Sequence, residues 1–333
     1  MRLAAECSKG VTAGRYGVME KIKLGISTCL LGEPVRYDGG HKLDRFLKDT
    51  LGQYVEYVPV CPEVECGLGT PREPVHLEGQ PGAIRLVTTR TKRDVTERMV
   101  AWSLQRVRDL ESENLCGFIF KSNSPSSGME RVRVWDPKGI PHKTGTGIFA
   151  EILMKRFPLL PFEEDRRLHD PVLRENFVER IFVLKRWREM LKQGQKTVRL
   201  IEFHARHKLL IMAHSPRHAG EMGKMVARAK EIPSKELFNR YETMLMEGLR
   251  LKATIRKNTN VLHHAVGYFK KLLTSDEKLE ILEVIDHYHK GYLPLVVPIV
   301  LLRHYVRKYD QPYLKEQYYV DPHPIELQLR NHA

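Results

Sequence analysis

The sequence predicts an α/β region built on an open parallel sheet, followed by an all-α region. In the first half, short β-branched or apolar runs alternate with turns and helical patterns, which is typical of a parallel sheet covered by helices. In the second half, apolar residues recur with the period of a helix, roughly 3.6 residues. Between the two, residues 158–171 carry three prolines and no apolar period, which indicates a domain boundary.

The first half contains five short runs with strand character. They are residues 22–28, 54–60, 85–89, 116–121 and 131–134. Helical spacing occurs over residues 41–51, 96–112 and 148–157, so strands and helices alternate along the chain. We therefore expect a Rossmann-like domain over residues 21–157.

The second half has the pattern of consecutive helices. The predicted helices are residues 177–191, 196–213, 220–231, 235–255, 259–273, 276–289 and 293–309. Ser234 and the pair Thr274 and Glu277 are typical helix starts, because their side chains can cap free backbone N–H groups. We expect an all-α domain over residues 172–310, followed by an irregular end.

The charge of the chain is strongly positive and unevenly distributed. The net charge is +14, which favours a polyanionic partner. Residues 1–150 hold 22 Lys and Arg against 18 Asp and Glu, a net charge of +4. Residues 151–333 hold 33 against 23, a net charge of +10. Most of the electrostatic attraction is therefore expected in the helical half.

The cysteine count and the apolar runs predict a soluble cytoplasmic protein. Five cysteines, an odd number without a secretory segment, favour reduced thiols over a disulfide framework. The longest apolar run, 293–302, contains two prolines and is too short to span a membrane. The first eighteen residues lack a periodic pattern, so we expect an extension outside the fold, with Cys7 in it.

Three cysteines follow predicted strand ends. Cys29 comes after the first strand, and Cys61 and Cys66 come after the second. Because parallel strands end at one edge of the sheet, these thiols could meet there, and three thiolates would leave the fourth iron of a cubane cluster free. Zinc usually has four closed ligands with short paired spacings, which are missing here. Buried apolar cysteines are the equally open alternative.

Glu63 and a serine-rich turn lie close to the same predicted edge. Glu63 could act as a general base beside the cysteines, or be an ordinary loop carboxylate. Ser124, Ser126 and Ser127 could form an anion-binding turn of hydroxyls and N–H groups, although serine is also common in plain turns. His204, His207 and His214 suggest either a metal or a cluster of satisfied histidines.

These motifs resemble those of the thiouracil desulfidase family. The resemblance covers about residues 21–157 and rests on several motifs in the family order: Cys29-Leu30-Leu31-Gly32, Val35-Arg36-Tyr37-Asp38-Gly39, Cys61-Pro62-Glu63, Gly67-Leu68-Gly69, Pro71-Arg72, and Lys121 with Ser124-Pro125-Ser126 and Gly128. The second half, with residues 206–215, resembles the helical YbgA-like family. The combination is similar to bacterial desulfidases that act on 4-thiouridine in transfer RNA.

The resemblance implies a [4Fe-4S] cluster held by three cysteines. Cys29 and Cys61 match two of the family ligands. The third ligand position of the family holds Ser127 here instead of cysteine. Cys116 begins a strand that ends near Ser127, so it should lie at the opposite edge of the sheet. We therefore predict that Cys66 supplies the third thiolate.

The resemblance also implies site roles and a hydrolytic reaction. Glu63 would activate water, with Ser124 beside it as a second catalytic group. The residues expected to bind the substrate are Arg36, Tyr37, Asp38, Arg72, Lys121, Ser126 and Ser127. The expected partner is transfer RNA containing 4-thiouridine, with no membrane. Two alternatives stay open: a desulfidase of free thiolated bases such as thiouracil, and a non-catalytic RNA-binding or cluster-sensing protein.

Overall fold

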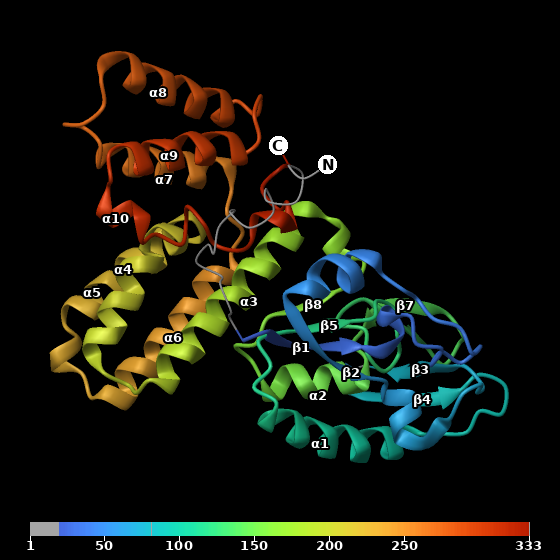
Figure 1. Cartoon of the computed structure of the whole chain (residues 1–333). Helices are drawn as coiled ribbons and strands as arrows, with labels where there is room; N and C mark the ends of the chain where they lie inside the picture. Colours follow the sequence, from blue (N-terminus) through green and yellow to red (C-terminus); the bar gives the residue numbers. More distant parts are fainter. Residues whose placement is uncertain (1–19, 81, 333) are drawn as a thin grey trace, which may run out of the picture.

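The structure is a computed structural model that describes residues 20–80 and 82–332. The predicted N-terminal extension and Cys7 lie outside these residues. The described chain has a sheet part, residues 20–165, and a helical part, residues 171–332. Figure 1 shows the two parts side by side, with α3 running along their junction. The predicted fold class, α/β followed by all-α, is confirmed.

The main sheet is entirely parallel. It contains β1 (Ile22–Ser27), β2 (Val55–Val60), β5 (Phe118–Phe120) and β8 (Phe162–Glu164) in the order β2-β1-β5-β8. The chain pairs β2 on one side of β1 and later returns to pair β5 on the other side. The direction of strand addition therefore reverses between β1 and β5, which is where ligands bind in open α/β sheets.

Strand β8 lies within residues 158–171, where the prolines predicted a domain boundary. It pairs in parallel with β5, so the sheet extends past residue 157. The strand has only three residues, and two of them are glutamates, so it carries no apolar period. Glu163 and Glu164 are nevertheless buried. Two of their oxygens accept hydrogen bonds, from Arg167 Nε and from the Met129 N–H.

The sequence predicted only two of the four strands of a second, mixed sheet. Its strands are β3 (Val75–Gln80), β4 (Ala83–Thr88), β6 (Val132–Trp135) and β7 (Pro141–Gly145), in the order β4-β3-β6-β7. Strands β4 and β6 match predicted runs, whereas β3 and β7 were missed. Strand β7 reads Pro-His-Lys-Thr-Gly and is exposed along most of its length, so it lacks the apolar alternation of a strand.

Two predicted helices lie beside the sheets and a third is replaced by turns. Helices α1 (Thr96–Ser112) and α2 (Ile148–Arg156) are confirmed and lie together on one side of the main sheet (Figure 1). The helix expected over 41–51 is instead a π-helical turn, Phe46–Thr50, followed by a 3₁₀ turn, Leu51–Gln53.

All seven predicted helices of the second half are present. They are α3 (Pro171–Lys192), α4 (Thr197–His214), α5 (Pro216–Ala227), α6 (Ser234–Arg250), α7 (Ile255–Gly267), α8 (Ser275–His289) and α9 (Val296–Lys308), followed by the short α10 (Pro312–Lys315). Thr274 and Glu277 form the predicted capping box of α8. The remaining C-terminal segment is largely irregular and returns to α3 (Figure 1).

One apolar core runs through both parts. The same cluster of buried side chains includes Leu24 of β1, Phe118 of β5, Ile181 of α3 and Leu329 near the C-terminus. Helix α3 approaches the sheet closely, since a Cβ on Gly117 would lie 2.9 Å from Ile181 Cγ2. No helix in the described residues is long and apolar enough to cross a membrane.

Candidate active site

A pocket opens where β1, β2 and β5 end. Its volume is about 290 Å³. It lies beside the β1/β5 position at which the strand order reverses, so the topology places it where an α/β sheet binds ligands. Its lining comes from the three segments that follow these strands: Ser27, Thr28, Cys29, Val35, Arg36, Tyr37, Val60, Cys61, Pro62, Glu63, Arg72, Pro74, Val75, Lys121, Ser122, Asn123, Ser124, Pro125 and Ser127.

Two cysteines line the pocket as free thiols. Cys29 lies in the 3₁₀ turn that follows β1, and Gly32, with a φ of 94°, ends that turn. Cys61 directly follows β2, and its Sγ lies 3.8 Å from the Val35 carbonyl oxygen. Burial raises the pKa of Cys29 to about 11, and burial followed by the charge of Glu63 raises the pKa of Cys61 to about 12. Without a bound cation, both thiols are therefore protonated near neutral pH.

Glu63 connects the cysteine segment to the serine turn. Its Oε1 accepts hydrogen bonds from Ser126 Oγ at 2.5 Å and from Ser124 Oγ at 3.4 Å. Its Oε2 lies 3.8 Å from Cys61 Sγ and 3.8 Å from Arg72 Nη2. The carboxylate is thus held between hydroxyl donors and a guanidinium while still lining the pocket.

Hydrogen bonds within the serine turn and to the first turn of α2 hold its conformation. Ser124 Oγ accepts hydrogen bonds from the N–H groups of Ser126 and Ser127, at 3.3 and 3.1 Å. The Ser126 carbonyl accepts the N–H of Phe149 at 3.0 Å, in the first turn of α2. A Cβ on Gly147 would lie 2.4 Å from the Ser126 backbone, so this close approach requires glycine. Ser124 and Ser127 line the pocket, whereas Ser126 lies behind them, fully buried.

Lys121 is fixed by an aspartate that the sequence analysis did not select. Lys121 Nζ lies 2.9 Å from Asp165 Oδ2, and Asp165 Oδ1 accepts the Ser122 N–H at 2.8 Å. Burial alone would raise the pKa of Asp165, but Lys121 and Ser122 hold it below its usual range. Asp165 immediately follows β8, in the segment predicted to be the domain boundary, and no pattern in the sequence marked it.

The predicted substrate-binding residues after β1 divide into two groups. Arg36 and Tyr37 line the pocket, and the Arg36 guanidinium lies 5.3 Å from the Tyr37 ring centroid. Asp38 does not line it; its Oδ1 accepts the Gly40 N–H at 3.0 Å and stabilises the turn. Arg72 lines the pocket and donates to the Val35 and Gly69 carbonyls, both at 2.9 Å, so it holds two loops together.

The structure places the other described cysteines outside the pocket lining. Cys66 Sγ lies 3.5 Å from the Glu63 carbonyl oxygen and packs in a second apolar cluster with Leu77 and Met99. Ser127, in contrast, lines the pocket with Cys29 and Cys61. Cys116 lies at the start of β5, where its N–H donates to the Lys23 carbonyl at the opposite edge of the sheet.

The three histidines singled out in the sequence all have partners. His204 Nδ1 lies 3.1 Å from the Tyr241 hydroxyl, and His207 Nδ1 lies 2.7 Å from the Phe203 carbonyl. His214 Nε2 lies 2.8 Å from Glu179 Oε2. They are therefore parts of the helical core and do not converge on a common site.

Two family models match consecutive regions of the chain. Residues 24–165 match the family described as 2-thiouracil desulfurase, and residues 208–324 match a protein family of unknown function, DUF1722. Among solved structures, the [4Fe-4S]-dependent thiouracil desulfidase TudS is 29% identical, with a TM-score of 0.38, over 45% of this chain and 95% of that one.

Two bacterial relatives match over most of their own length. The uncharacterized protein YbgA of Escherichia coli (strain K12) is 31% identical over 153 residues, which is 46% of this chain and 90% of YbgA. The uncharacterized protein YbbK of Bacillus subtilis (strain 168) is 30% identical over 135 residues, 38% of this chain and 87% of YbbK. The chain therefore belongs to the families of both relatives, YbgA and YbbK, and its two family matches are a 2-thiouracil desulfurase region and a DUF1722 region.

Proposed function

We propose that this protein is a desulfidase that removes sulfur from 4-thiouridine in transfer RNA. The observation that carries the proposal is the pocket at the β1/β5 edge, which brings two free thiols, Cys29 and Cys61, to the Glu63 carboxylate. The pocket lies within the 2-thiouracil desulfurase region, residues 24–165. The pocket, about 290 Å³, is at the small end of ligand pockets, which usually measure about 300–1,000 Å³, so a small group such as a single base is favoured over a large ligand.

The donors in the pocket suit a [4Fe-4S] cluster. Cys29 and Cys61 would hold it, since thiolates are the usual ligands of such clusters. Ser127 lines the pocket where a third ligand is expected, and Cys66 lies one turn behind Glu63 as the other candidate. Once bound, the cluster would supply a thiophilic Lewis acid for the thiocarbonyl sulfur.

Glu63 would act as the general base that accepts a proton from an attacking water. Ser126 orients Oε1 by donating its hydroxyl proton, and Oε2 faces the Cys61 side of the pocket. A carboxylate held in this way can accept a proton from a water beside the pyrimidine and return it to the leaving group. Ser124 connects the carboxylate to the N–H groups of the serine turn.

Two cations would stabilise negative charge that develops on the substrate. Lys121 Nζ is held by Asp165, so a fixed positive charge lines the same pocket as Cys29. Arg36 lines the entrance beside the half-exposed Tyr37 ring, where a pyrimidine could stack. Positioned charges of this kind favour the transition state because they need no reorganisation during the reaction.

The charge of the helical half supports a nucleic acid substrate over a free base. Residues 151–333 carry 33 Lys and Arg against 23 Asp and Glu, a net charge of +10. A free thiolated base carries no phosphate to use that charge, whereas a folded RNA presents many phosphates. Binding of transfer RNA should therefore weaken steeply as salt is raised.

The test is the loss of thiouridine absorbance when anaerobically reconstituted protein is mixed with transfer RNA that contains 4-thiouridine. We expect absorbance to fall over many turnovers, and a Cys29→Ala, Cys61→Ala double variant to be inactive. Free thiouracil is tested as a second substrate in the same assay. If its absorbance falls faster than that of the transfer RNA, the substrate would be a free thiolated base instead of transfer RNA. Tight RNA binding without loss of absorbance, in protein with a confirmed cluster, would favour a binding or sensing protein.

A further inference from the structure

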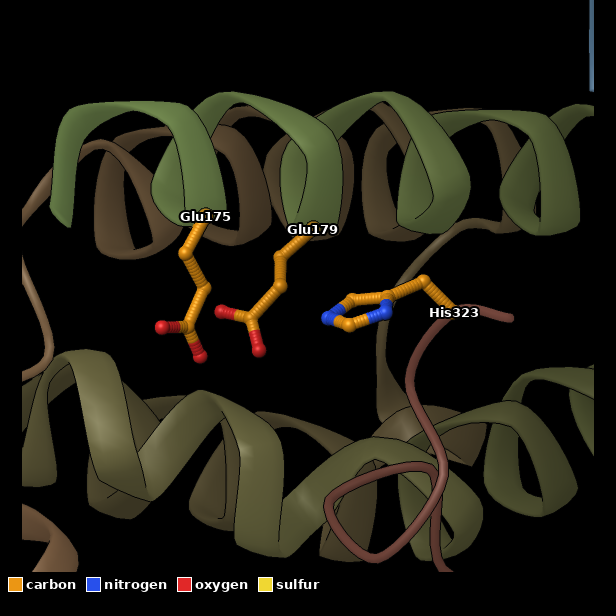
Figure 2. A group of neighbouring side chains, drawn as sticks. All are labelled: Glu175, Glu179 and His323. Atoms are coloured by element: carbon orange, nitrogen blue, oxygen red, sulfur yellow. The ribbon is translucent and has the colours of Figure 1, made fainter. Parts of the chain in front are cut away.

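A group of buried ionisable side chains lies inside the helical part, in a different part of the structure from the pocket. Glu175 and Glu179 are one turn apart on α3, and His323 comes from the C-terminal segment. Figure 2 shows both carboxylates projecting from α3 toward the interior, with the His323 ring turned toward Glu179. One ligand atom from each of the three residues lies within 4.8 Å of the others.

The imidazole of His323 has a buried nitrogen without a partner among the described residues, which indicates that this site binds something. The residue is only 5% exposed, and its Nε2 atom has no hydrogen-bond partner. The other ring nitrogen, Nδ1, lies 3.2 Å from the Pro324 carbonyl oxygen and can only donate there. In the neutral ring Nε2 therefore carries a lone pair. A buried nitrogen of this kind normally has a partner, and a second hydrogen bond that fixes the ring is typical of metal-binding histidines.

The carboxylates already have polar partners. His214 Nε2 lies 2.8 Å from Glu179 Oε2, and His214 Nδ1 lies 2.7 Å from the Leu251 carbonyl oxygen. Arg330 lies 2.9 Å from Glu179 Oε1 through Nη2 and 3.2 Å from Glu175 Oε1 through Nε. Arg330 therefore bridges one oxygen of each carboxylate, and His214 contacts the second oxygen of Glu179. Among the described ligand atoms of this cluster, His323 Nε2 is the one left without a partner.

Two of the three residues, Glu175 and Glu179, line a cavity, whereas His323 lies outside its lining. The cavity measures about 260 Å³, and its other polar lining includes Asn176, Asn258 and His332. His332 Nε2 also lies 3.3 Å from Glu175 Oε2. A hydrated ion could enter this space, and water could complete its coordination, which three protein ligands leave open.

We propose that Glu175, Glu179 and His323 bind one divalent transition-metal ion, of the Mn²⁺ or Zn²⁺ kind. Two carboxylates and one imidazole are ligands that these ions accept, with water in the remaining positions. A carboxylate oxygen has a second lone pair, so it can bind an ion while Arg330 or His214 donates to the first. The ion would join the C-terminal segment to α3. This proposal does not depend on the desulfidase reaction.

The test measures metal binding by the full-length protein. Mn²⁺ is the first probe, because it prefers oxygen and imidazole ligands over thiolates, and its free form is counted by electron paramagnetic resonance. We expect one Mn²⁺ per chain and a metal-dependent rise in melting temperature. Zn²⁺ is tested in the Cys29→Ala, Cys61→Ala variant, so that the pocket thiols cannot bind it.

Two variants locate the site. His323→Phe keeps a ring of similar size and removes a nitrogen that has no partner, so the fold should tolerate it; we expect binding weaker by at least about tenfold. Glu175→Gln is the second variant, and the exposed His264→Phe is the matched control that should bind as the parent does. Failure to bind either metal, or unchanged binding in both site variants, would overturn the proposal and leave Arg330 as the counter-ion of the cluster.

Discussion

Replacing Glu63 by glutamine tests the chemistry of the pocket most directly. The side chain keeps its shape but exchanges one carboxylate oxygen for an NH₂ group. If the amide oxygen takes the place of Oε1, it still accepts from Ser126, and the NH₂ group then faces Arg72, 3.8 Å from the replaced oxygen. Glu63→Gln therefore removes a half-buried negative charge and places the new NH₂ group, a donor, opposite the Arg72 guanidinium, which is also a donor.

The expected size of the effect follows from these contacts. A buried donor left without an acceptor costs about 1–3 kcal/mol, so the free energy of unfolding should fall by that amount. Removing a general base lowers a rate by about 10²–10⁴-fold, which is much more than the stability change alone would cause. The cysteines are unchanged, so the iron content should stay equal to that of the parent.

The assay compares initial rates of 4-thiouridine loss at equal iron content, with urea unfolding of the same samples. Glu33→Gln is the matched control, because Glu33 is an exposed carboxylate near the same edge of the sheet. A Glu63→Gln protein that turns over as fast as the control would remove Glu63 from the mechanism.

Three further predictions concern the third ligand, the buried ion pair and the effect of acid. Ser127→Cys should raise the amount of iron bound per chain after anaerobic reconstitution, as measured by a colorimetric iron assay. If Ser127→Cys binds no more iron and Cys66→Ala binds less, the third ligand is Cys66. Asp165→Asn should lower the free energy of unfolding by about 1–3 kcal/mol, because the half-buried Lys121 charge loses its carboxylate partner and keeps only Ser122; an unchanged urea midpoint would contradict this. Burial lowers the pKa of His204 to about 4 from the ordinary 6.5, so the unfolded chain binds the proton first as pH falls. Stability from this group is complete above pH 6.5 and is lost toward pH 4, by roughly 3 kcal/mol, and His204→Gln should flatten that part of the pH profile in chemical denaturation.

The parallel sheet was predictable where burial left a clear pattern. Strand β1 appears in the sequence as an apolar run because it is central and almost fully buried. Strand β2 lies at the edge of the sheet, with only Val55 and Val60 buried, but its valines still mark it as a strand. Strand β3 alternates Val75, Leu77 and Gly79 with polar residues, so it did carry a signal that the charged composition of the segment obscured. Strand β8 carried none, since hydrogen bonds rather than apolar contacts satisfy its buried glutamates.

The pocket was predictable only where residues directly follow a strand. Cys29, Cys61 and the serine turn belong to this class, because the end of a strand fixes where the next residues lie. Cys66 follows five residues later, in a π-helical turn in which Gly67 has a φ of 85°, and this turn directs the thiol toward the second sheet. Such backbone detail, like the return of Asp165 to Lys121, depends on tertiary contacts that spacing does not encode.

The apolar core shared by the two parts holds the helical part at a fixed distance from the pocket. Only Arg166–Asp170 separate Asp165, which fixes a pocket lysine, from the first turn of α3, and α3 packs directly on the main sheet. The helical part therefore cannot pivot freely against the pocket. An RNA gripped by the helical part would have to deliver its modified base across one fixed span, so the distance from its phosphates to that base would select the position that reacts.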